Sequence, residues 1–178
     1  TSKGAKKRNW LDKLKIKNYY LFDEIEANPS IDDVDKIISE INQSNISQVI
    51  GLGGGTSLDV AKFVAHRIKK FKILVPTTFG SGSEVTRISV LKVNGKKKSF
   101  HDDELFANVA IIDSDFLKDS PEMIIKNSAI DNGAAVLSKY PRYLWDSCFC
   151  LFSINFFNWE YVIISGISSV LILGTEKF

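Results

Sequence analysis

The chain has 178 residues, with 23 basic and 21 acidic side chains and a formal net charge of +2. Proteins that bind nucleic acid need a concentrated basic surface, so this near balance argues against that class. The basic run at residues 96–98 is typical of a solvated turn.

The first predicted elements are a helix and a strand. Residues 3–15 form a basic segment in which Trp10, Leu11 and Leu14 share one side. This pattern predicts a surface helix with one buried edge. Residues 19–22 are aromatic and aliphatic, and they predict a strand.

The next predicted helix is marked by its start. Ser30 and Asp33 have the spacing of a capping box, in which each side chain satisfies a main-chain N–H of the first turn. Apolar residues then recur at helical spacing, so the helix is predicted to run to about residue 44. Its apolar stripe indicates core packing rather than a binding groove.

Residues 48–76 predict a strand, a helix and a strand in succession. Residues 48–52 and 73–75 are short apolar runs, and Ser57 is suited to cap a helix over residues 58–68. A helical connection of this length predicts parallel strands and a right-handed crossover. The loops that follow the two strands should then lie at the same edge of the sheet.

Three further elements are predicted beyond this unit. Residues 88–93 form one strand of a β-hairpin that turns at Asn94-Gly95, because this pair suits positive φ angles. Residues 109–113 predict a strand that ends in an aspartate. Pro121 is well placed in the first turn of another helix.

The composition changes after residue 140. Residues 141–178 are rich in Phe, Trp, Ile and Ser and carry few charges, and we interpret them as a divergent apolar tail. The apolar run at residues 161–173 is too short to cross a bilayer, so no membrane partner is expected.

The cysteines and the start of the chain bear on localisation. Cys148 and Cys150 are separated by one residue, which favours reduced thiols and a cytoplasmic protein. No charged-then-apolar signal segment stands at the start.

Two loops carry nearly all the recognisable chemistry. Residues 51–57 read Gly-Leu-Gly-Gly-Gly-Thr-Ser, and residues 76–86 read Pro-Thr-Thr-Phe-Gly-Ser-Gly-Ser-Glu-Val-Thr. A glycine run between a strand and a helix exposes main-chain N–H groups that bind phosphate. Alone, the first loop is also compatible with a tight turn without a ligand. The two loops on neighbouring strand ends favour a large phosphorylated ligand.

Together the loops resemble those of the iron-containing (group III) alcohol dehydrogenase family. The family's Gly-Gly-Gly-Ser-x-x-Asp-x-x-Lys loop is matched from Gly53 to Lys62, with Thr56 in place of its Ser. Its Pro-Thr-Thr-x-Gly-Thr-Gly-Ser-Glu segment is matched by residues 76–84, with Ser81 in place of the middle Thr. Asn28-Pro29 and the strand ending in Asp113 also match, so the resemblance covers about residues 1–131.

The resemblance implies an α/β fold, with a Rossmann-like parallel sheet and flanking helices, followed by the degenerate start of a helical domain. We expect an NAD-binding domain over residues 1–118 that lacks the family's first strand. The start of a helical metal-binding domain would occupy residues 119–140, and the tail residues 141–178. Family enzymes are longer, so the resemblance implies a truncated chain.

The resemblance also implies which residues bind NAD. Asp23 would accept hydrogen bonds from the ribose hydroxyls and favour NAD over NADP; the alternative is an exposed loop acid. Asp59 would shape the phosphate loop, unless it only stabilises the helix. Lys97 occupies the place of a cofactor-facing lysine, although Lys96 and Lys98 blur the assignment. The implied NAD-binding residues are Asp23, Gly53, Gly54, Gly55, Thr56, Ser57, Asp59, Thr77, Thr78, Ser81, Ser83 and Lys97.

This sequence has only part of the site that binds the family's divalent metal, Fe or Zn. Asp131 matches the metal-binding Asp, but the His expected four residues later falls on Ala135, and the Glu after it on Ser138. His66 and His101 are read as surface histidines. Because catalytic sites use about three protein ligands, we expect no stoichiometric metal.

The resemblance implies an NAD(P)-dependent, metal-assisted oxidoreductase that interconverts a small-molecule alcohol and an aldehyde. Two alternatives stay open. An enzyme like dehydroquinate synthase or glycerol-1-phosphate dehydrogenase also has a Gly-Gly-Gly loop, although residues 80–84 argue against it. An inactive fragment would bind nucleotide weakly or act only through association. Homo-oligomerisation is compatible with each of these functions.

Overall fold

The computed structural model describes residues 1–41, 45–78, 80–113, 115–116, 121–124, 126–127, 162–165 and 170–173. The helices are α1 (Lys3–Lys7), α2 (Trp10–Lys13), α3 (Ile31–Glu40) and α4 (Gly55–Arg67), with 3-10 turns η2 (Ser83–Val85) and η3 (Asp103–Leu105). The strands are β1 (Gln48–Gly53), β2 (Phe71–Pro76), β3 (Ile88–Val93), β4 (Lys96–His101), β5 (Val109–Asp113), β6 (Val162–Ser165) and β7 (Val170–Leu173).

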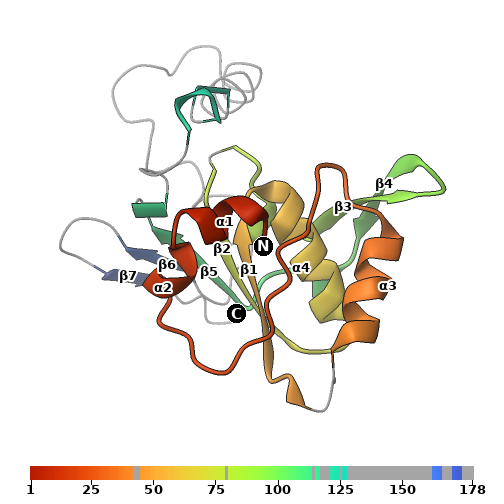
Figure 1. The fold of residues 1–178 in the computed structure, drawn as a ribbon, viewed down its shortest axis with the longest axis horizontal. Coiled ribbons are helices and arrows are strands. Elements are labelled where there is room, and N and C mark those ends of the chain that lie inside the picture. The colour runs from red at the N-terminus through yellow and green to blue at the C-terminus, as the bar shows by residue number, and fades with distance from the viewer. Residues whose placement is uncertain are drawn as a thin grey trace.

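The fold is built on a five-stranded sheet with the order β1-β2-β5-β6-β7, and β3 and β4 form a separate pair (Figure 1). The first four strands are parallel, and β7 returns antiparallel to β6. This arrangement confirms the predicted α/β class, with a parallel sheet and flanking helices. Strands β6 and β7 come from the segment that we interpreted as a tail, and the sequence did not predict them.

The β1–α4–β2 unit confirms the predicted strand, helix and parallel strand. Gln48 is aligned with Phe71 and Gly53 with Pro76 along the whole pair. The predicted cap is wrong, because α4 begins at Gly55 with Gly54 as its N-cap and no capping side chain. Gly54 is extended, at φ −76° and ψ 176°, so the chain enters the helix three residues earlier than a cap at Ser57 requires.

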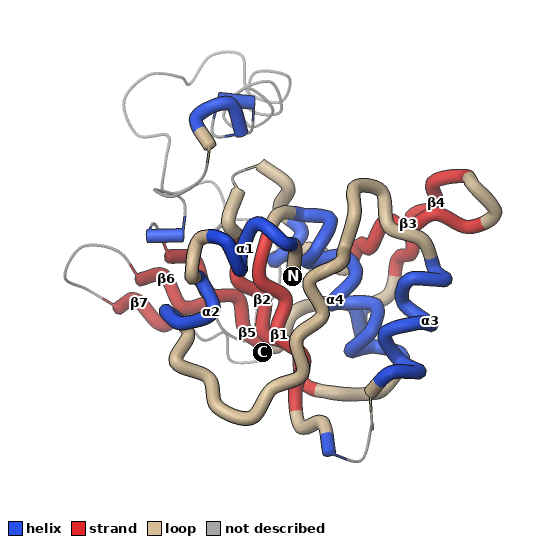
Figure 2. Tube along the Cα trace, viewed as in Figure 1, coloured by secondary structure: helices blue, strands red, loops and turns tan. Residues whose placement is uncertain are grey.

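Helices cover both faces of the sheet (Figure 2). On one face, Leu52 and Val75 pack with Ala5 of α1 and Trp10 of α2. On the other face, Leu74 packs with residues of α4. Alternate side chains of each strand therefore point to opposite helical layers, as the two-residue period of a strand requires.

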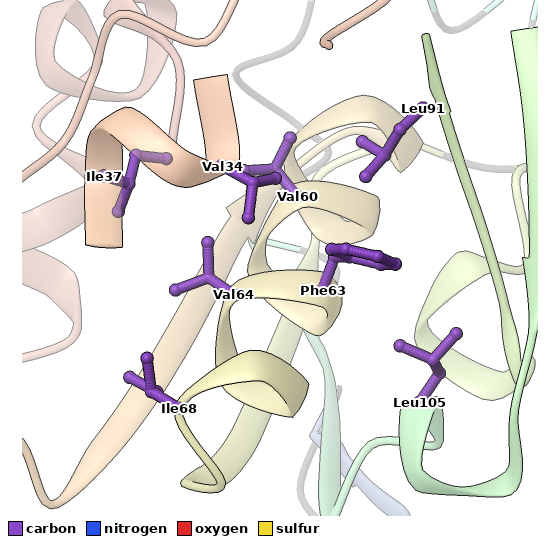
Figure 3. Packing of buried hydrophobic residues seen from close by; sticks show 8 residues of the cluster. All are labelled: Val34, Ile37, Val60, Phe63, Val64, Ile68, Leu91 and Leu105. Carbon is purple, nitrogen blue, oxygen red and sulfur yellow. The ribbon is translucent and has the colours of Figure 1, made fainter. Parts of the chain in front are cut away.

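The outer face of α4 packs against α3 and the hairpin. The cluster includes Val34 of α3, Val64 of α4 and Leu91 of β3 (Figure 3). The ring of Phe63 lies 4.7 Å from that of Phe100 on β4, measured between centroids. Helix α4 is thus buried between the sheet and a second apolar layer.

The N-terminal segment differs from the predicted single helix over residues 3–15. It forms the short helices α1 and α2, because Asn9 between them adopts a left-handed conformation at φ 53°. The predicted buried edge is confirmed at Trp10, whose exposed fraction is 3%.

The predicted strand at residues 19–22 is wrong. These residues form a loop alongside β1, and Tyr19 and Tyr20 are exposed. A cavity of about 380 Å³ separates this loop from β1 and α4. Aromatic residues favour a strand only where another strand pairs with them, and the described sheet ends at β1.

Local sequence signals are confirmed at α3 and at the hairpin. The Ser30 hydroxyl accepts from the Asp33 N–H at 3.2 Å, and the Asp33 carboxylate accepts from the Ser30 N–H at 2.7 Å. Helix α3 ends at Glu40, earlier than the predicted residue 44. The hairpin turns at Asn94 and Gly95, with φ angles of 52° and 76°.

The strand predicted at residues 109–113 is confirmed as β5, which pairs with β2. Residues 122–124 and 126–127 are helical after Pro121, as predicted. Cys148 and Cys150 lie outside the described residues. None of the helices in the described part of the chain is long and apolar enough to cross a membrane.

Candidate functional site

The glycine loop and the second loop meet at one edge of the sheet. Gly53 ends β1 and is aligned with Pro76, so both loops leave the sheet together. The Thr77 N–H donates to the Gly53 carbonyl at 2.9 Å. Parallel pairing therefore places the loops as the sequence predicted.

Three glycines let the loops approach closely. Gly53 has φ 149°, which a residue with a side chain rarely adopts, and a Cβ there would lie 2.8 Å from the Ser57 hydroxyl. A Cβ on Gly54 would lie 3.2 Å from Oγ1 of Thr78, and one on Gly55 would lie 2.7 Å from Cβ of Ser81. The absence of side chains at these glycines thus lets the first loop lie in close contact with Thr78 and Ser81 of the second.

The start of α4 supplies main-chain donors at the same place. The Ser57 and Leu58 N–H groups donate to the Gly54 carbonyl at 2.9 and 3.2 Å. The N–H groups of Gly55 and Thr56 precede these and have no carbonyl one helical turn earlier. With the positive end of the helix dipole, they suit an anion such as a phosphate.

Gly51 and Ser57 support the loop from within. A Cβ on Gly51 would lie 2.7 Å from Cβ of Ala61 and 2.9 Å from Cδ2 of Leu74. Gly51 therefore allows β1 and α4 to pack closely. Ser57 is buried beneath Gly53, so its hydroxyl faces the loop from the protein side.

Asp59 and Lys62 connect α4 to the segment after the second loop. The Asp59 carboxylate accepts from the Ser83 hydroxyl at 2.6 Å and from the Val90 N–H at 3.1 Å. Lys62 lies 3.1 Å from that carboxylate and donates to the Ile88 carbonyl. The Lys62 side chain has an exposed fraction of 0%. Both residues contact groups of the protein's own core.

Glu84 lies beside this network. Its Oε2 is buried, and no hydrogen-bond partner is found for it in the described part of the chain. Burial raises the pKa of Glu84, and its own main-chain N–H and Lys62 offset only part of that effect. Burial lowers the pKa of Lys62, while Asp59 and Glu84 favour its charged form.

Asp23 lies near the same edge of the sheet, on the outer side of β1. The Thr1 nitrogen donates to the Phe22 carbonyl at 3.0 Å, and the Thr1 hydroxyl donates to the Leu52 carbonyl at 2.6 Å. The Asp23 carboxylate lies 3.8 Å from the ammonium of Lys6. Asp23 follows a loop, so the predicted strand before it is wrong, and the structure places Asp23 near the end of β1 instead.

Other predicted residues lie apart from this group of contacts. Lys97 is exposed on β4, aligned with Lys92 of β3. His66 lies in the last turn of α4, 3.3 Å from Glu104, and His101 is exposed at the end of β4. Asp131 lies outside the described residues. In the part of the chain that the structure covers, no three His, Cys, Asp or Glu residues gather in a way that could hold a metal.

The family model for iron-containing alcohol dehydrogenase matches residues 1–114. The chain belongs to this family. Among curated relatives, it is 33% identical over 121 residues to the 4-hydroxybutyrate dehydrogenase of Clostridium kluyveri, covering 58% of this chain and 33% of that protein. It is 31% identical over 133 residues to the long-chain-alcohol dehydrogenase 1 of Geobacillus thermodenitrificans, covering 63% and 34%.

Solved structures of the iron-containing alcohol dehydrogenase family agree with this assignment. The crystal structure of an iron-containing alcohol dehydrogenase from Thermotoga maritima superposes with a TM-score of 0.65 at 31% identity, covering 74% of this chain and 44% of that one. The chain thus spans about a third of the length of the curated relatives described above.

The sequence did not predict how the iron-containing alcohol dehydrogenase motifs interact. Asp59 and Ser83 belong to separate motifs, yet the structure joins them by a hydrogen bond. Ser89, which no motif marks, donates to the Asp59 carbonyl at 2.9 Å. The only sequence signal for these contacts was that Ser83 and Ser89 are polar residues in segments next to apolar runs. The fold is needed to show that both pair with Asp59.

Proposed function

We propose that this chain binds NAD at the edge where the glycine loop meets the second loop. The observation that carries the proposal is the contact of Gly53, Gly54 and Gly55 with Thr77, Thr78 and Ser81 at the uncapped start of α4. The main-chain donors there suit the pyrophosphate. The Thr78 and Ser81 side chains lie beside Gly54 and Gly55.

Asp23 is proposed to choose between the two nicotinamide cofactors. A carboxylate at this place accepts from the adenosine ribose hydroxyls and repels a 2′-phosphate. Its position near the end of β1 supports that role. Bound NAD would supply a hydride acceptor, and the chain's own contribution is to bind and orient it.

The family's wider activity supports a further proposal about the whole protein. An intact protein of this kind would act on a small-molecule alcohol or aldehyde, without nucleic-acid or membrane partners, in the cytoplasm. For the metal, the donor set does not fit, because a methyl group at Ala135 cannot coordinate and Asp131 alone gives one carboxylate. The proposed role of this chain is therefore nucleotide binding without metal-assisted turnover. The second candidate is an inactive fragment that binds nucleotide weakly or acts only through association, and the incomplete set of metal ligands favours it.

Titration calorimetry with NAD tests the site. Gly54→Asp should weaken binding about tenfold or more, because a carboxylate would face the pyrophosphate. Gly54→Asn is the matched control, since it has nearly the same shape without the charge. It should retain more affinity than the aspartate variant. Equal affinity of Gly54→Asp and the parent protein would overturn the phosphate-loop assignment.

Elemental analysis and an NADH absorbance assay test the proposed lack of metal-assisted turnover. We expect no stoichiometric Fe or Zn and no oxidation of a panel of diols and primary alcohols. One metal per chain, with turnover that a chelator removes, would show that this chain has a complete metal site.

A further inference from the structure

The second loop is held at its two ends by different kinds of contact. At its start, the Thr77 N–H donates to the main chain of Gly53 at 2.9 Å. At its end, the Ser83 hydroxyl donates to the side chain of Asp59 at 2.6 Å. Gly80 and Gly82 lie between these ends, both with positive φ and without side chains to stiffen the loop. The position of the loop therefore depends on both anchors.

The second anchor is close to the proposed binding space. The Ser83 N–H donates to the Ser81 hydroxyl at 3.4 Å. Ser81 in turn lies against Gly55, since a Cβ added to Gly55 would be only 2.7 Å from the Cβ of Ser81. A continuous series of contacts thus runs from Asp59 through Ser83 and Ser81 to the start of α4.

Lys62 fixes the anchor in place. Its ammonium lies 3.1 Å from Asp59 and donates to the main-chain carbonyls of Ile88 and, at 3.5 Å, Thr86. Because Lys62 is fully buried, it is placed to act on the loop through Asp59 and the main chain after η2 rather than by touching a ligand. The Val90 N–H adds a further hydrogen bond to the Asp59 carboxylate at 3.1 Å.

We propose that Asp59 and Lys62 are positioning residues that hold the second loop over the start of α4 through the Ser83 hydroxyl. The inference rests on the proposed NAD site and gives Asp59 and Lys62 a role there that needs no contact with the cofactor. It also assigns Ser83 a new role. The Ser83 hydroxyl donates its hydrogen bond to Asp59 and so fixes the position of the second loop. Loss of this anchor lowers NAD affinity because the loop must be ordered when the ligand binds.

Two buried serines allow a matched test, because each donates one hydrogen bond to Asp59. Ser83 donates to the carboxylate from the loop, whereas Ser89 donates to the main-chain carbonyl from β3. Ser83→Ala and Ser89→Ala should lower the melting temperature by similar amounts. Ser83→Ala should weaken NAD binding about fivefold or more, and Ser89→Ala should leave it within about twofold.

A second pair of variants removes a buried lysine ammonium, whereas the first pair removes a serine hydroxyl. Lys62→Met removes the ammonium beside Asp59, and Lys72→Met removes a second lysine that is buried among the described residues, on β2. Lys62→Met should weaken NAD binding, while Lys72→Met should not. Because the Lys62 side chain is fully buried, a loss of affinity in Lys62→Met would point to positioning and not to a lost contact with NAD. The serine pair keeps the test valid where Lys62→Met does not fold.

Hydrogen exchange without ligand supplies a readout that a general loss of stability would not give. In Ser83→Ala, the amides of residues 80–83 should exchange faster while those of β1 and β2 keep the protection seen in Ser89→Ala. Parent-level NAD affinity in both Ser83→Ala and Lys62→Met would overturn the positioning role and leave the NAD site intact. A parent protein that does not bind NAD would overturn the proposed function, and this inference with it.

Discussion

The two sides of β1 differ in how they are filled. On one side, β2 pairs with β1 along its whole length, and α4 packs so closely that Gly51 has no room for a side chain. On the other side, residues 16–22 pass as a loop across a cavity of about 380 Å³. The glycine loop of the proposed site therefore stands on the tightly packed side of β1, and Asp23 lies on the outer side.

The largest expected effect comes from filling the packed side. Gly51→Val should destabilise the fold by about 3 kcal/mol, because its side chain would overlap Ala61 and Leu74. For a chain of this length, this corresponds to a fall in melting temperature of roughly 6–12 °C. Thermal unfolding followed by circular dichroism measures it.

The control for that change lies on the outer side of β1. Tyr20 has an exposed fraction of 64%, so Tyr20→Ser should alter stability by no more than about 0.5 kcal/mol. An equally large loss in Tyr20→Ser would contradict the contrast between the two sides.

A smaller, pH-dependent effect is expected at Glu84, beside α4. Burial raises the pKa of this carboxyl, so the folded state favours its neutral form. Its contribution to stability is fully present below the unfolded glutamate pKa of about 4.3 and is lost as pH rises through the higher folded value. Glu84→Gln should therefore melt at a higher temperature than the parent protein at pH 7.

The advantage of Glu84→Gln should shrink as the pH falls toward 4. Melting curves of both proteins across this range measure it. A constant difference at all pH values would show that the substitution acts through packing and not through ionisation.

The smallest effect is expected on the outer side, at Asp23. Asp23→Ala should raise the affinity for NADP relative to NAD by a few-fold, because a negative charge facing the 2′-phosphate is removed. Lys6, 3.8 Å away, already offsets part of that charge, which limits the change. Competition titrations with both cofactors measure the ratio. An unchanged ratio would make Asp23 an ordinary loop acid.

Sequence signals succeeded where the residues that interact are close in the chain. Ser30 and Asp33 form their capping box, and Asn94-Gly95 turns the hairpin, because each depends on a few consecutive residues. The order strand, helix, parallel strand could also be predicted, since the helical period between two apolar runs leaves few other arrangements.

Prediction failed where the outcome depends on distant partners. Residues 19–22 have the composition of a strand, but they form a loop with no strand pairing to them in the described sheet. Ser57 has the residue type of an N-cap, yet the helix begins at Gly55, where the two loops are in close contact. The hydrogen bond between Asp59 and Ser83 joins residues 24 positions apart, so no local pattern reveals it.

Helix α4 both supplies the proposed anion site at its first turn and fills the centre of the core with Val60, Phe63 and Val64. A ligand held at its start binds only the folded chain, so binding and folding share one free-energy balance. At a concentration one hundred times its dissociation constant, NAD would add about 2.7 kcal/mol to the free energy of unfolding. The melting temperature of this protein should therefore report the nucleotide concentration around it.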